Sequence, residues 1–146
     1  MTDSHVDPER AQSAAFKARP RDTVTPMPTL VGSKYKATYP AGHPLAGANL
    51  SGAEAYANYG RDSGPVFERL GGRIVWRGAM EAMVIGPDGE SWDAMFVAEY
   101  PNSGAFMAMV TDPVYRQAVV HRQAAVETSR LIRTAPRETG SGRFAD

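Results

Sequence analysis

Apolar and polar positions alternate with a period of two along residues 29–39, near the start of the chain. Val31, Tyr35, Ala37 and Tyr39 fall on one side of this segment, and Lys34, Lys36 and Thr38 fall on the other. A period of two among residues that favour β-structure predicts a half-exposed strand. Pro40 ends the pattern, and the glycine- and proline-rich residues 41–50 are expected to form a loop.

The pattern then changes to steps of three and four residues, which are typical of a helix. Ser51 and Glu54 have the spacing of a capping box and predict the helix start. Pro65 lies inside the helical pattern and has no N–H to donate to the carbonyl of Arg61, so we expect a kink or two abutting helical pieces. Gly71 is expected to close the helix. The apolar stripe of this helix consists of Tyr56, Tyr59, Val66, Phe67 and Leu70.

Two strand-like segments, residues 73–85 and 91–100, flank the turn sequence Gly-Pro-Asp-Gly at 86–89 and predict a hairpin. Glu99 falls on the face of the second strand opposite Trp92, Phe96 and Tyr100.

The remaining segments predict two helices and a last strand. A short apolar helix is expected from Ser103 to Val110. A second helix, capped by Asp112 with proline in its first turn, runs to about Val126. Residues 129–134 complete a β-α-β-β-α-β order, which is the ferredoxin-like pattern. The sequence thus predicts an α+β fold, a four-stranded antiparallel sheet with two helices on one face. The opposite face needs a cover, and a second copy of the chain is the simplest one.

The ends of the chain differ in composition from the middle. Residues 1–28 are polar and rich in proline and carry no secretory signal, so we expect a disordered or partner-draped arm. Residues 29–135 form the expected folded domain, and residues 136–146 a flexible tail.

Charge and cysteine content narrow the partners and the compartment. Sixteen basic and sixteen acidic residues give no net charge, so we expect neither nucleic acid nor an anionic membrane as partner. No stretch approaches the roughly 20 apolar residues of a membrane span. The chain has no cysteine, which excludes disulfides and thiol chemistry and fits a reducing compartment, so a cytoplasmic location is expected.

Four runs, at residues 53–60, 71–78, 97–101 and 112–122, read AEAYANYG, GGRIVWRG, VAEYP and DPVYRQAVVHR. In this order and at about this spacing they resemble the family known as domain of unknown function 1330, in the dimeric α+β-barrel superfamily. The resemblance covers roughly residues 30–134 and implies a dimer with a possible cavity between sheet and helices. The loop at 41–50 looks inserted, and Val84-Ile85-Gly86 stands where the family tends to place a glutamate before glycine. The superfamily includes cofactor-independent monooxygenases, isomerases, dehydrating enzymes and haem proteins, so the resemblance implies no particular reaction.

Three residues are candidate catalytic groups: Glu99, His121 and His43. A carboxylate at a strand end can act as a general base, and histidine ordinarily titrates near neutral pH. Each has a structural alternative. Glu99 would form an ion pair that ties a helix to the sheet, His121 would be a surface or capping residue, and His43 would be an exposed loop residue.

Candidate substrate-binding residues are Arg77, Arg122, Tyr35, Tyr56 and Tyr115. Phenols and guanidinium groups can hold an oxyanion, although tyrosines at these spacings also pack as core with the hydroxyl at the rim. The three histidines show no paired spacing, which argues against a metal site. Haem needs only one axial histidine and stays open, but nothing in the sequence supports it, so no cofactor is expected.

Two hypotheses remain open from the sequence. In the first, the chain binds a small molecule and is a cofactor-independent enzyme, of proton-transfer, isomerase or monooxygenase type, on a carbonyl or phenolic metabolite. In the second, it is a non-catalytic homo-oligomeric binding or assembly module.

Overall fold

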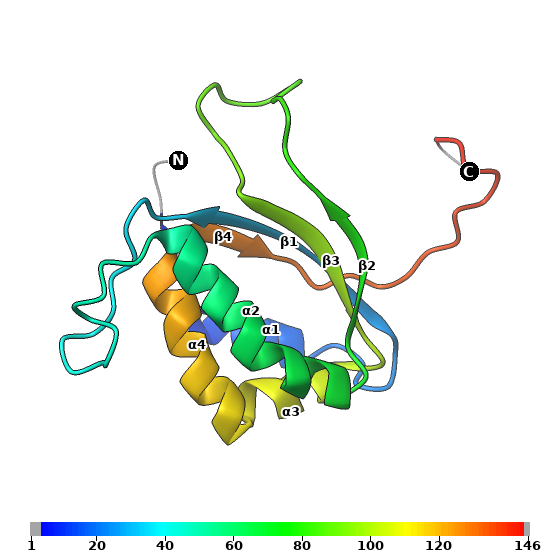
Figure 1. Ribbon diagram of the computed structural model, residues 1–146. Coiled ribbons are helices and arrows are strands. Elements are labelled where there is room, and N and C mark those ends of the chain that lie inside the picture. The colour runs from blue at the N-terminus through cyan, green and yellow to red at the C-terminus, as the bar shows by residue number, and fades with distance from the viewer. Residues whose placement is uncertain (1–3, 145–146) are drawn as a thin grey trace.

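A computed structural model describes residues 4–144 of the chain. Four antiparallel strands form one sheet in the order β2-β3-β1-β4. Helices α2 and α4 lie side by side against one face of this sheet, with α3 at their end (Figure 1). The elements are α1 (Arg10–Lys17), β1 (Thr25–Ser33), α2 (Gly52–Arg69), β2 (Arg73–Gly78), β3 (Ala94–Tyr100), α3 (Ser103–Thr111), α4 (Pro113–Ala125) and β4 (Val126–Leu131). The βαββαβ order and the α+β ferredoxin-like architecture expected from the sequence are confirmed.

The first strand is not where the sequence pattern placed it. β1 spans residues 25–33 rather than 29–39, and it pairs with β3 from Thr25 onward. Pro26 and Pro28 direct their carbonyls toward the segment after β4, to the N–H groups of Thr134 and Ile132. The N–H of a strand residue points to the same side as its carbonyl, here the side away from β3. The two prolines therefore remove no hydrogen bond between β1 and β3.

Part of the expected disordered arm is also regular structure. Residues 10–17 form α1, and residues 25–28 belong to β1. The Arg133 side chain donates a hydrogen bond to the Phe16 carbonyl at 2.8 Å and its guanidinium lies over the Phe16 ring. Residues 1–3 and 145–146 lie outside the described part of the chain. Residues 136–144 form neither helix nor strand, and contact of the arm with a partner stays a prediction.

Helix α2 begins as its capping box predicts. The Ser51 hydroxyl accepts from the Glu54 backbone N–H, and the Glu54 carboxylate accepts from the Ser51 N–H, both at 3.0 Å. The expectation of two helical pieces at Pro65 is wrong, because α2 is one helix from residue 52 to 69. Gly71, at φ +85°, adopts the left-handed conformation that closes it.

The hairpin is confirmed, but its strands are shorter than expected. β2 ends at Gly78 and β3 begins at Ala94, so residues 79–93 form a long connection that projects from the sheet (Figure 1). Val84 and Ile85 in this connection are 90% and 93% exposed. The last strand, β4, likewise begins earlier than expected, directly after α4.

The core fills the space between the helices and the sheet. Its buried residues are Met27, Val66, Ala98, Tyr100, Met109 and Tyr115. Because side chains alternate along a strand, the strand neighbours of Met27, Ala98 and Tyr100 point to the other face of the sheet. Val97 and its cross-strand partner Trp76 lie on this helix-free face, and Trp76 is 53% exposed.

No helix within residues 4–144 combines the length and the apolar character that crossing a membrane requires.

Candidate functional site

The segment between β1 and α2 is fixed against the C-terminal end of α4. The backbone N–H of Lys34 donates to the Ala125 carbonyl at 2.7 Å, and that of Thr38 donates to the Ala124 carbonyl at 2.9 Å. These carbonyls are in the last turn of a helix, where intrahelical donors are lacking. The segment therefore supplies hydrogen-bond donors to the free carbonyls at the end of α4. In doing so it places Tyr39 and His43 beside α4.

Tyr39, His121 and Asp62 form a continuous hydrogen-bonded chain. The Tyr39 hydroxyl lies 2.6 Å from Nδ1 of His121, and Nε2 of His121 lies 3.2 Å from a carboxylate oxygen of Asp62. The carboxylate can only accept, so Nε2 carries the proton that it shares with Asp62. In the neutral imidazole Nδ1 is then the acceptor of the Tyr39 O–H. We name these three residues the relay.

His121 is buried within this arrangement. Its residue exposure is 8%, whereas Tyr39 and His43 are half-buried at the surface. The fixed hydrogen bonds at both ring nitrogens set the orientation of the imidazole. Access from solvent to the relay is therefore greater at Tyr39 than at His121.

His43 covers Tyr39 from the loop side. The two rings stack with centroids 4.7 Å apart, and the His43 and His121 rings meet edge to face at 5.8 Å. Nδ1 of His43 accepts from the Leu45 backbone N–H at 3.0 Å. The neutral ring of His43 therefore carries its proton on Nε2, as a donor.

The carboxylate of Asp62 is held in its charged form by a neighbouring arginine. Arg61 Nε donates to Asp62 at 2.8 Å, and this hydrogen bond is the main reason that the pKa of Asp62 lies below its ordinary value. The charge of Arg61 and the interaction with His121 lower the same pKa further, against the opposing effect of desolvation. Asp62 is thus an acceptor for the imidazole at neutral pH.

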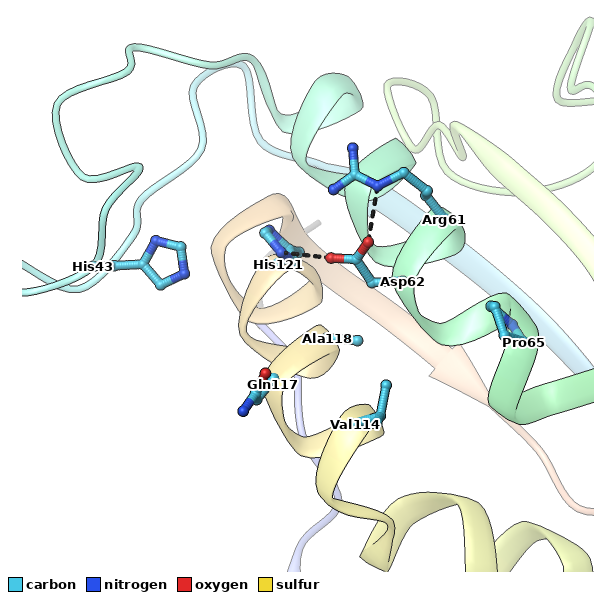
Figure 2. Close-up of a pocket in the computed structure, with 8 residues that line it drawn as sticks. All are labelled: His43, Arg61, Asp62, Pro65, Val114, Gln117, Ala118 and His121. Carbon is cyan, nitrogen blue, oxygen red and sulfur yellow. Dashed lines mark hydrogen bonds and ion pairs between the residues drawn. The ribbon is translucent and has the colours of Figure 1, made fainter.

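The relay opens onto a cleft of about 430 Å³ between α2, α4 and the loop. Figure 2 shows that its apolar side chains, Pro65, Val114 and Ala118, lie between the two helices, while the histidines and Gln117 lie toward the loop. The lining residues are His43, Arg61, Asp62, Pro65, Val114, Gln117, Ala118 and His121.

Two of the three predicted catalytic residues, His43 and His121, come together at this cleft. Glu99 does not. It lies on the helix-free face of the sheet, paired with Arg73 of the neighbouring strand at 2.9 Å. The structural alternative expected an ion pair between a helix and the sheet. The observed ion pair instead joins two neighbouring strands, β2 and β3.

The predicted binding residues lie elsewhere. Tyr115 is in the core, where its hydroxyl meets that of Tyr59 at 3.0 Å. Burial raises the pKa of Tyr56 to about 12, and the charges of Arg122 and Arg77 act to lower it. Arg122 donates to the Val6 carbonyl and, at 3.1 Å, to the Ser129 hydroxyl. Tyr35 is 90% exposed and lines no part of the cleft.

Sequence reasoning missed Tyr39, Arg61, Asp62 and Gln117 as site residues. One signal was present: Asp62 lies three residues after Tyr59 and four before Val66, so it interrupts the apolar stripe of its helix. His121 interrupts the face of α4 that carries Ala118 and Ala125 in the same way. A titratable residue on each of two facing apolar stripes indicates a polar pair.

Within residues 4–144, no three histidine or acidic side chains are grouped so that they could hold a metal ion.

Comparison with known proteins adds the family and the fold. The sequence model of the family described as Domain of unknown function (DUF1330) matches residues 42–134. Two crystal structures of the RPA0582 protein of unknown function from Rhodopseudomonas palustris, one of them methylated, are each 53% identical to the chain. They cover 93% and 94% of this chain and 99% and 98% of theirs, with TM-scores of 0.86 and 0.87.

More distant structures are similar to the chain in part. A dabb family protein with a ferredoxin-like fold from Mesorhizobium loti is 14% identical over 79% of this chain and 98% of its own, with a TM-score of 0.45. SnoaB, a cofactor-independent oxygenase from Streptomyces nogalater, is 14% identical over 82% of this chain and 97% of its own, at 0.46. These likenesses carry no inference about chemistry. No curated protein is similar to the chain at a significant level.

Proposed function

The chain belongs to the DUF1330 family, and from this premise and the geometry of the relay we propose that it is a cofactor-independent enzyme that moves a proton on a small carbonyl or phenolic metabolite bound in the cleft. The observation that carries the proposal is the hydrogen-bonded chain of Tyr39, His121 and Asp62 at the edge of a cleft. An imidazole held between a hydroxyl and a carboxylate is the arrangement that transfers protons in many unrelated enzymes.

The relay would act through Tyr39, which is half-buried and stacks on His43, a residue that lines the cleft. The phenol oxygen takes an acidic proton from the substrate while the phenol O–H proton passes to Nδ1 of His121. The imidazolium formed has both nitrogens protonated and is stabilised by the carboxylate of Asp62. Return of the proton by the reverse steps, to a different atom of the substrate, completes an isomerisation with no other reactant.

The site of this proposal differs from the internal cavity that the family resemblance implied. The space between sheet and helices is filled by Met27, Met109 and core tyrosines. Glu99 takes no part, because it is paired with Arg73 on the opposite face of the sheet.

The test has two stages. A thermal-shift screen of small carbonyl compounds and phenols identifies a binder, since a ligand at 100 times its dissociation constant adds about 2.7 kcal/mol of stability. Exchange of the binder's acidic C–H in D₂O is then followed by proton NMR. We expect His121→Gln to slow this exchange by about 10²-fold or more, as for a general base.

His5→Gln is the matched control, because the His5 side chain lies outside the cleft and only its backbone makes hydrogen bonds. Exchange that is as fast in His121→Gln as in His5→Gln contradicts the proposal. A screen with no binder among these compounds does so as well.

The second candidate function, a homo-oligomeric binding or assembly module, is supported by the helix-free face of the sheet. Trp76 is half exposed there beside Val97, and the adjacent β1 positions Pro28 and Leu30 add apolar surface. Water-exposed tryptophan on a continuous apolar face favours a second copy of the chain as cover. A cytoplasmic location and the absence of nucleic-acid and membrane partners stay predictions.

Light scattering on the purified chain tests the association. We expect a dimer at micromolar concentration and a shift toward monomer in Trp76→Ser. Tyr35→Ser removes an aromatic side chain of greater exposure away from this face and serves as control. A wild-type monomer contradicts the dimer.

A further inference from the structure

Hydrogen-bond donors outnumber acceptors at the loop side of the cleft. Among residues 4–144, Asp62 is the one carboxylate that lines the cleft, and it is already engaged by Arg61 and by His121. Arg61 uses Nε for Asp62 and Nη1 for Asn58, so Nη2 keeps its donors. Nε2 of His43 is also a donor, since its Nδ1 accepts from the backbone.

Gln117 adds a third group. Its amide makes no hydrogen bond within residues 4–144, and it lines the cleft one turn before His121 on α4. Figure 2 shows His43 and Gln117 on the side of α4 toward the loop, and the Arg61 guanidinium on the α2 side, beyond Asp62. A ligand group that accepts several hydrogen bonds at once is the complement of such a set.

The other side of the cleft is lined by apolar side chains. Pro65 of α2 faces Val114 and Ala118 of α4. A ligand that covers these side chains removes apolar surface from water, which favours binding. The two sides together fit a molecule with an anionic head and an apolar body.

We propose that the cleft binds small organic carboxylates. The carboxylate accepts hydrogen bonds on the loop side, where His43 and Gln117 lie, and the apolar body lies against Pro65, Val114 and Ala118. The identity of the substrate rests on the proposed function. If that function holds, the substrate is a carbonyl or phenolic compound that itself carries a carboxylate. The binding can be measured without turnover.

The experiment compares benzoate with benzamide, which has the same shape without the charge. Each is titrated into the full chain while the histidine ring protons are followed by NMR. We expect benzoate to bind about tenfold tighter than benzamide, the ratio that about 1.4 kcal/mol from charge-assisted hydrogen bonds produces. Inorganic phosphate, which has no apolar body, is expected to bind more weakly than benzoate.

Gln117→Glu places a negative charge at the proposed carboxylate position without a change in shape. It should weaken benzoate binding about tenfold and leave benzamide within about twofold. Ala108→Glu adds the same charge at an exposed position of α3 outside the cleft and should change neither. Proton NMR spectra of the free variants confirm that each is folded.

The inference is overturned by equal affinities for benzoate and benzamide, by binding of neither, by phosphate binding as tight as benzoate binding, or by a Gln117→Glu variant that still binds benzoate normally. Failure here is separable from failure of the proposed function. If exchange depends on His121 while benzoate and benzamide bind equally, proton transfer stands and the carboxylate preference falls. If benzoate is preferred but exchange does not depend on His121, the carboxylate preference stands and the proton transfer falls.

Discussion

Tyr39→Phe removes one oxygen atom from the relay and nothing else. The ring that stacks on His43 at 4.7 Å is retained, and so is the shape of the loop side of the cleft. The change deletes the 2.6 Å hydrogen bond to Nδ1 of His121. The variant therefore measures the contribution of that bond to the stability of the fold.

The magnitude follows from the burial of His121. With 8% of the residue exposed, water cannot replace the lost hydroxyl at Nδ1 unless the loop moves. An unsatisfied buried acceptor costs about 1–3 kcal/mol. Since Tyr39 itself is half-buried, we expect a loss of about 1–2 kcal/mol in the free energy of unfolding, which lowers the Tm by about 2–8 °C for a chain of this length.

Urea unfolding of wild type and variant provides the measurement, with stability read from midpoints at a constant m-value. Tyr35→Phe is the matched control, because that hydroxyl is in the same segment on a residue that is 90% exposed. It should stay within about 0.5 kcal/mol of wild type. Equal stabilities of Tyr39→Phe and Tyr35→Phe would refute the buried hydrogen bond and, with it, the relay.

Three further changes test the surroundings of the site. Gly52→Ala places a Cβ 2.0 Å from the Lys34 carbonyl oxygen and should lower stability by about 1–3 kcal/mol in urea unfolding; an unchanged midpoint would show that the helix start can move freely. The Val114 N–H is the main cause that lowers the pKa of Asp112 from 3.8, so its carboxylate stabilises the fold above that pH and loses this effect as pH falls through the lowered value. Asp112→Ala should therefore lower the Tm at pH 7 and have a smaller effect in acid, and an equal effect at both would contradict the linkage. Arg133→Gln removes the side chain that holds α1, and it should speed tryptic cleavage after Lys17 and Arg21; an unchanged digestion rate would mean that α1 is held by other contacts.

Local chemistry explains why much of the fold could be predicted from the sequence. The capping box at Ser51 and Glu54 satisfies the first N–H groups of α2, and Asp112 does the same for α4. Both signals act within three residues along the chain, so no knowledge of the packing is needed to interpret them. The order of strands and helices followed from these starts.

The position of β1 could not be predicted in this way. Its alternation continues to Tyr39, but the strand ends at Ser33, where the ladder shows a bulge. From Lys34 onward the backbone bonds to the end of α4 instead of to a strand. That choice depends on a helix end some 90 residues further along the chain, which no local pattern contains.

The site was predicted in part for the same reason. His43 and His121 could be found because histidine is rare in this chain and suited to proton transfer. The sequence pattern placed Tyr39 on one face of a strand that ends before it, and it did not select Asp62. The role of Asp62 comes from the packing of α2 on α4, and that of Tyr39 from the hydrogen bonds that hold its segment against the end of α4.

The stretch before α1 has a consequence for how this protein can aggregate. The N–H of Ser129 donates to the His5 carbonyl at 2.8 Å, so the beginning of the chain occupies the outer edge of β4. In the described part of the chain, the strand order leaves β2 as the other border of the sheet, with a bulge within it. A sheet can be extended into a fibre only if both of its borders accept a new strand. With one border blocked by its own chain, edge-to-edge pairing through β2 joins two molecules and then stops.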